Sequence, residues 1–203
     1  MRSEEEKKSR FAAAIRKIDE ANAHDPNKEL VEGREQPREW VYSRWLTDWV
    51  LRLSPEGSEE LRLAARCQHV CRWTIPRSSY PMDRPGYLKW RAVLKEFHAE
   101  KAGELLREAG YGDDVIARVQ DLVRKKNFPK DPDSRILEDA LCMVFLERQF
   151  PDLARKTSEE KVINALHKSW KKMTPQARAI ALTLPYGEKE KELLQRAELG
   201  RGD

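Results

Sequence analysis

The chain has 203 residues, of which 36% are charged and 39% hydrophobic, including six Trp, five Tyr and five Phe. This content of apolar and aromatic side chains predicts a soluble globular protein with a heavily charged surface and excludes a disordered chain. A membrane-spanning helix needs about 20 consecutive apolar residues, and long apolar runs such as residues 140–146 are far shorter. The polar N-terminus lacks the apolar stretch of a signal peptide, so we expect a cytoplasmic protein with no membrane partner. The three cysteines form no CxxC pair, which argues against a disulfide framework or a structural zinc module.

The net charge of +4 is unevenly distributed. Between Arg62 and Arg91 seven basic side chains occur with a single acidic one, Asp83. A basic stretch inside a nearly neutral protein predicts a confined anion site rather than a broad nucleic-acid surface. The alternative interpretation is a solvated face with scattered salt bridges.

Apolar residues recur at helical spacing along nearly the whole chain, and no alternating strand pattern is evident. Residues 1–9 are expected to be a disordered polar N-terminus, residues 10–199 a single helical domain, and residues 200–203 a frayed tail. The predicted helices cover, in chain order, residues 10–22, 38–53, 58–73, 85–109, 113–126, 133–149, 158–172, 175–183 and 187–199. The predicted fold class is therefore all-α, a single-domain bundle of eight to nine helices.

Several predicted helix boundaries carry capping signals. Ser58 precedes the third helix and Gly110 follows the fourth. Thr157 with Glu160 has the spacing of a capping box, and Thr174 stands before a first-turn proline. The segment 74–84 contains two prolines and two arginines, so we expect a loop that can line a site.

Signatures of the common enzyme classes are absent from the sequence, including the nucleophile elbow, the P-loop, the dinucleotide fingerprint and HExxH. The metal-capable residues His69, His98 and Asp139 lie on three different predicted helices, with Glu138 beside the last. Two imidazoles and a carboxylate converging in a bundle suit a divalent metal with open positions for water and substrate. The alternative is that the histidines are ordinary core or surface residues and that the two acids are favourable first-turn charges.

Helical spacing predicts two shared faces that can bind a phosphate. Arg66, His69 and Arg72 are three residues apart, and Tyr87, Arg91 and His98 follow one stripe of the next helix. Arginine suits phosphate because its planar fork donates paired hydrogen bonds and stays charged when buried. The predicted substrate-binding residues are Arg66, Arg72, Arg77, Tyr80, Arg84, Tyr87 and Arg91, with Trp73 and Trp90 as further stacking partners.

Five segments of the chain carry a resemblance to a known family: residues 11–27, 68–81, 86–91, 97–99 and 137–147. Through them the chain resembles, over nearly its whole length, an uncharacterised family, domain of unknown function 4202. The enzyme name sometimes attached to that family, glutamyl-tRNA synthetase, implies HIGH-like and KMSKS-like motifs, and neither occurs here.

A remoter resemblance links residues 61–70 and 135–140 with helices of the HD phosphohydrolase superfamily, which implies an HD-like helical fold. It matches Asp139 with the final metal ligand of that superfamily and His98 with an auxiliary histidine. The chain departs from the pattern, with Tyr42 at the first histidine, Gln68-His69 at the His-Asp pair, and Lys125 or Lys126 at the later histidine. The site then either uses the shifted ligand set His69, His98 and Asp139 or binds no metal.

Two functions follow as expectations, with an interaction scaffold as a third. The first is a metal-dependent hydrolase acting on a phosphorylated small molecule or nucleotide, with Glu138 and Asp139 as catalytic residues. Its metal is Mn, Fe, Zn or Mg, which would lower the pKa of a bound water. The second is a non-catalytic module that binds a nucleotide, RNA or an anionic metabolite through the arginines.

Overall fold

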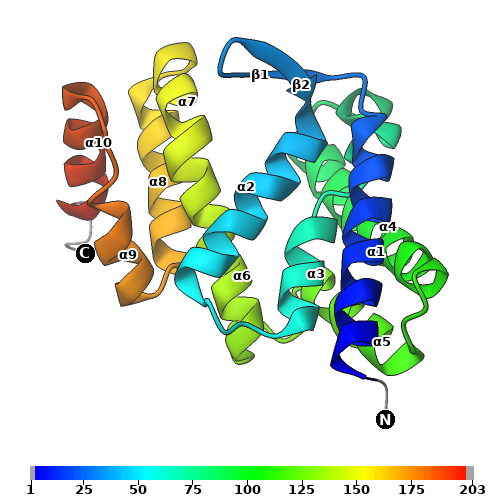
Figure 1. Ribbon diagram of the computed structural model, residues 1–203. Coiled ribbons are helices and arrows are strands. Elements are labelled where there is room, and N and C mark those ends of the chain that lie inside the picture. The colour runs from blue at the N-terminus through cyan, green and yellow to red at the C-terminus, as the bar shows by residue number, and fades with distance from the viewer. Residues whose placement is uncertain (1–2, 200–203) are drawn as a thin grey trace. The chain divides into compact units, whose positions relative to one another are not determined.

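The computed structural model describes residues 3–199 and is built of helices with one small hairpin (Figure 1). The predicted all-α class is confirmed. No helix in the described part of the chain is long and apolar enough to cross a membrane. The chain divides into two compact units, unit 1 (Met1–Ser134) and unit 2 (Arg135–Asp203), each described by itself.

Unit 1 is built around a short central helix, α3. It packs against α1, α2, α4 and α5, and Figure 1 shows it between α1 and α2. Leu61, Leu63 and Ala64 of α3 are fully buried on different sides of the helix, which is what a helix enclosed by neighbours requires. The elements of unit 1 are α1 (Glu4–Ala23), β1 (Lys28–Val31), β2 (Arg34–Pro37), α2 (Arg38–Leu53), α3 (Glu59–Cys67), the 3₁₀ turns η1 (Arg72–Thr74) and η2 (Arg77–Ser79), α4 (Arg84–Glu108) and α5 (Asp113–Arg124).

Unit 2 contains α6 except its first residues, followed by five further helical segments. Here α7, α8 and α10 pack on one another, with Phe150 and Leu166 fully buried. Its elements are α6 (Pro132–Val144), the π-helix η3 (Phe145–Gln149), α7 (Phe150–Lys156), α8 (Glu159–Lys172), α9 (Pro175–Ala181) and α10 (Glu188–Leu199).

The first helix begins earlier than predicted. Ser3 and Glu6 form a capping box in which each side chain accepts a hydrogen bond from the other residue's backbone N–H. The polar segment 4–9 is therefore helical in the structure and not the disordered N-terminus that was expected. The predicted tail, residues 200–203, lies outside the described residues.

The hairpin β1–β2 was not predicted, because its strands are short and mostly polar. Its two-residue turn places Glu32 at φ 50° and Gly33 at φ 76°, and positive φ at both positions is typical of the tight turns that join paired strands. Asp25, just before the hairpin, accepts a hydrogen bond from the backbone N–H of Glu39 at 3.0 Å. Asp25 thereby caps α2, whose own N-cap residue, Pro37, makes no such bond.

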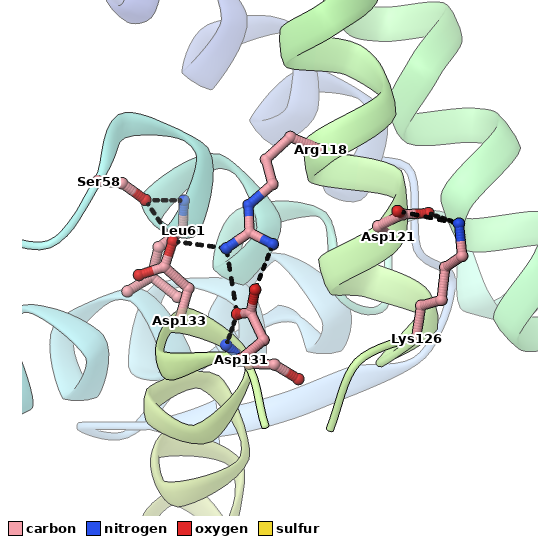
Figure 2. A network of polar contacts seen from close by, with 8 residues as sticks. Ser58, Leu61, Arg118, Asp121, Lys126, Asp131 and Asp133 are labelled. Carbon is pink, nitrogen blue, oxygen red and sulfur yellow. Dashed lines mark hydrogen bonds and ion pairs between the residues drawn. The ribbon is translucent and has the colours of Figure 1, made fainter. Parts of the chain in front are cut away.

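A polar network joins α5 to the starts of α3 and α6 within unit 1 (Figure 2). Arg118 of α5 donates to both oxygens of Asp131 and to Asp133, at 2.6, 3.1 and 3.0 Å. Ser58 caps α3 as predicted, accepting from the N–H of Leu61, and its hydroxyl donates to Asp133 at 2.9 Å. The arginine thus neutralises two aspartates beside two helix N-termini.

Two further predictions concern caps in unit 2. Thr174 caps α9 as expected, accepting from the N–H of Ala177 at 3.2 Å. The predicted capping box of Thr157 and Glu160 is wrong, because α8 begins one residue later, after Ser158. Thr157 instead donates its hydroxyl hydrogen to the carbonyl of Leu153, at the end of α7.

Candidate functional site

The candidate site is built on the turn that follows α3, residues 68–71. The helix was predicted to continue to residue 73 but ends at Cys67, and Cys71 adopts a left-handed conformation with φ 54°. The carbonyl of Val70 accepts from Nδ1 of His98 on α4 at 2.9 Å, and the N–H of Cys71 donates to Asn22 on α1 at 3.1 Å. Side chains from other helices thus satisfy the backbone groups that a longer helix would have paired.

Two imidazole rings lie side by side at this turn. The ring of His69 stacks on Tyr42 of α2, with 4.5 Å between centroids, and lies 5.8 Å from the ring of His98. Burial and the neighbouring His69 lower the pKa of His98 to about 3. Burial and Arg72 hold the pKa of His69 well below its ordinary value. Both imidazoles are therefore neutral near pH 7, as metal ligation or hydrogen-bond acceptance requires.

A buried acid, Glu39 of α2, completes the polar centre and was missed by the sequence analysis. Its Oε2 lies 3.5 Å from Nδ1 of His69, and its Oε1 lies 3.8 Å from Nε of Arg72. Burial raises the pKa of this carboxyl group to about 7, although Arg72 opposes the shift. A signal was present in the sequence, because Glu39 shares the i, i+7, i+11 stripe of Leu46 and Val50, both buried.

Cationic side chains surround the imidazole of His69. The guanidinium of Arg72 lies over the ring of Trp90, 4.8 Å from its centroid, while Arg91 donates to the hydroxyl of Tyr87 at 3.2 Å. Arg72, Arg91 and Lys125 all act to lower the pKa of His69. Of the predicted substrate-binding residues, Arg72 shares the carboxyl group of Glu39 with His69, and Arg91 lies next to Tyr87.

Arg66 has a different environment from the one predicted. Because α3 ends at Cys67, Arg66, His69 and Arg72 do not share one helical face, and that prediction is wrong. The guanidinium of Arg66 is buried and donates to both oxygens of Asp19 on α1, at 2.6 Å each. This bidentate pair fastens α3 to α1.

The proline-containing loop before α4 is non-helical apart from two 3₁₀ turns, in agreement with the prediction. Arg77 donates to the backbone carbonyls of Tyr80, Pro81 and Asp83, at 3.0, 2.6 and 3.2 Å, and so closes this loop on itself. Tyr80 is half-buried, and Arg84 is exposed at the first position of α4. The structure gives Arg77 a role in loop geometry.

The predicted catalytic pair, Glu138 and Asp139, belongs to unit 2, whereas His69 and His98 belong to unit 1. Glu138 accepts from Nζ of Lys172 at 2.8 Å. Both oxygens of Asp139 accept from Thr174, from its N–H at 2.8 Å and its hydroxyl at 2.6 Å. Within residues 3–199, no group of three or more His, Cys, Asp or Glu is arranged to hold a metal ion.

Comparison with known proteins gives one match. A family model described as a domain of unknown function, DUF4202, matches residues 12–194. The chain belongs to this family. No match was found among curated proteins or among solved structures. DUF4202 thus covers the candidate site completely, since Glu39, His69, Arg72, Arg91 and His98 all fall inside the matched range.

Proposed function

We propose that unit 1 binds a phosphorylated small molecule or nucleotide at the cations around His69. The observation that carries this proposal is the placement of two guanidinium groups on neighbouring aromatic rings: Arg72 lies over Trp90, and Arg91 donates to Tyr87, whose ring centroid is 6.0 Å from that of Trp90. The acid beside Arg72, Glu39, is about half ionised near pH 7 because its pKa is about 7, so it offsets only part of this charge. An excess of fixed positive charge beside a polar, uncharged centre favours an anionic ligand.

The two arginines are suited to phosphate in different ways. Arg72 is held by packing on Trp90 and by the ion pair with Glu39, so its fork is already oriented. Arg91 is exposed and hydrogen bonds to Tyr87 through one nitrogen, which leaves further donors for a ligand. A pre-oriented guanidinium beside an accessible one is an arrangement that grips a phosphate through several charge-assisted hydrogen bonds.

Isothermal titration calorimetry with inorganic phosphate, pyrophosphate and ADP tests this proposal. We expect Arg72→Met and Arg91→Met each to weaken binding of the tightest-binding of these three ligands by roughly tenfold or more, which is the cost of a lost hydrogen bond to a charged group. Methionine keeps the aliphatic packing of Arg72 on Trp90. Arg34→Met, on the exposed strand β2, is the matched control and should bind as the wild type does. Absence of binding by all three probes, or equal binding by wild type and variants, would contradict the proposal.

A metal-dependent hydrolase is the second candidate function. The observation that favours it is the pair of neutral imidazoles, with a lone pair of His98 directed into the protein interior. Two such nitrogens fit two ligands of Mn, Fe or Zn. Asp139 as a third ligand and Glu138 as the residue that activates water remain predictions. Metal analysis of the purified wild type, His98→Ala and Asp139→Asn distinguishes this candidate from a binding module.

A further inference from the structure

Four buried polar atoms around the turn 68–71 have no hydrogen-bond partner within the described residues. They are Nδ2 of Asn22, Oε2 of Glu39, Oε1 of Gln68 and Nε2 of His98. The great majority of buried polar atoms in folded proteins are hydrogen bonded. Four such atoms on residues that hold one turn therefore point to a group from outside the chain.

Three of these four atoms accept hydrogen bonds. The carbonyl of Val70 can only accept, so Nδ1 of His98 carries the hydrogen and the buried Nε2 of the neutral ring has the free lone pair. Gln68 donates through its Nε2 to the carbonyl of Val123, which leaves its Oε1 as an acceptor. Oε2 of Glu39 is also an acceptor when the carboxyl group is ionised. The group that completes this site must therefore supply mainly donors.

One of the three acceptors belongs to a residue that also contacts a cation of the proposed phosphate site. The carboxyl group of Glu39 links the buried acceptors with the phosphate site, because its Oε1 faces Arg72 at 3.8 Å and its Oε2 faces His69 at 3.5 Å. A ligand that bridges them must carry its donor within a few atoms of its phosphate. Hydroxyl groups fit better than amino groups, since an ammonium ion would be repelled by Arg72, Arg91 and Lys125.

We infer that the ligand of unit 1 is a phosphate ester with a hydroxyl group close to the phosphate, as in a phosphorylated polyol or sugar. The phosphate is held by Arg72 and Arg91, and the hydroxyl donates to Oε2 of Glu39 or Nε2 of His98. This inference rests on the proposed function and extends it to the carbon skeleton of the ligand. Inorganic phosphate, on this account, fills only half of the site.

Three esters of the same size test the inference: ethyl phosphate, 2-hydroxyethyl phosphate and 2-aminoethyl phosphate. Calorimetry at about pH 8 should give roughly tenfold tighter binding of the hydroxyethyl ester than of the ethyl ester. Glu39→Leu should reduce this preference while ethyl phosphate still binds. Glu29→Leu, on strand β1, is the control and should keep the full preference.

The outcomes separate the inference from the proposal on which it rests. Equal binding of the ethyl and hydroxyethyl esters would overturn the inference, because ordered water would then satisfy the buried acceptors, and leave the phosphate site intact. Tightest binding of the aminoethyl ester would overturn the choice of a hydroxyl group. Failure of all three esters and of inorganic phosphate would remove the proposed function itself. If Glu39→Leu fails to fold, as judged by circular dichroism, the comparison of the three esters on the wild type still decides.

Discussion

Burial of the Glu39 carboxyl group makes the stability of unit 1 depend on pH. Its pKa is raised from 4.5 to about 7, so the folded protein keeps this proton to a higher pH than the unfolded chain does. The free energy of unfolding therefore falls as the pH rises through this interval. The full loss from this one group amounts to about 3 kcal/mol.

Glu39→Gln should remove this dependence, because the amide does not titrate. We compare the free energy of unfolding of the variant with that of the wild type by urea unfolding. We expect this difference to be about 3 kcal/mol more favourable to the variant at about pH 8 than at about pH 4. Variant and wild type are compared at the same pH, because His98 adds a pH dependence of its own to both proteins. Its pKa is lowered from 6.5 to about 3, so it makes the free energy of unfolding rise between these two pH values. A constant difference for Glu39→Gln would show that its carboxyl group titrates normally.

The residues of the candidate site were predictable in part. The clustering of arginines between Arg62 and Arg91 includes Arg72 and Arg91, the two residues of the proposed phosphate site, because net charge along a segment is visible in the sequence. Arg66 lies in the same segment, yet its partner is Asp19, 47 positions away, and no local pattern shows such a pairing. Glu39 was missed because an acid on an apolar stripe is ordinarily taken as a boundary of the buried face.

Helices were more predictable than the segments that interrupt them. Caps at Ser58 and Thr174 are local, and both form as their spacing predicts. The end of α3 at Cys67 is set by Asn22 and His98, which bind the backbone of the following turn from other helices. The long predicted helix 133–149 is likewise divided, with the π-helix η3 after Val144. Tertiary hydrogen bonds decide such interruptions, so helical periodicity alone does not locate them.

Arg118 should contribute to stability because one side chain ties α5 to the N-termini of α3 and α6 (Figure 2). Arg118→Met leaves Asp131 and Asp133 close together without their shared cation. Since the arginine is about one-third exposed, we expect a loss of about 1 kcal/mol, measured by urea unfolding near neutral pH. Lys126→Met removes the nearby exposed pair with Asp121 and should change stability by less than about 0.5 kcal/mol. Equal effects of the two variants would contradict a special role for the Arg118 network.

The sequence predicts one helical domain over residues 10–199, and the chain divides into two compact units. The boundary at residue 134 falls in the first turn of α6, which begins at Pro132, and not in a linker between helices. Boundaries of this kind depend on which side chains pack together, and each unit has its own set of fully buried residues. Whether the units also unfold separately is a thermodynamic question, and the cysteines provide the means to answer it.

Cys67 and Cys71 lie in unit 1 and Cys142 in unit 2, and all three are buried thiols that form no disulfide. Each thiol reacts with an alkylating reagent only when its surroundings open, so mass spectrometry of the labelled peptides reports on each unit separately. When 2-hydroxyethyl phosphate is present at a concentration of 100 times its Kd, labelling of Cys67 should slow by up to about 100-fold, because the open form of unit 1 does not bind this ligand. We expect Cys142 to be labelled at an unchanged rate, since the residues of the proposed site all lie in unit 1. Arg72→Met with the same concentration of 2-hydroxyethyl phosphate is the control and should show little protection of Cys67. Equal protection of Cys67 and Cys142 in the wild type would contradict separate opening and would mean that the chain unfolds as the single domain its sequence predicts.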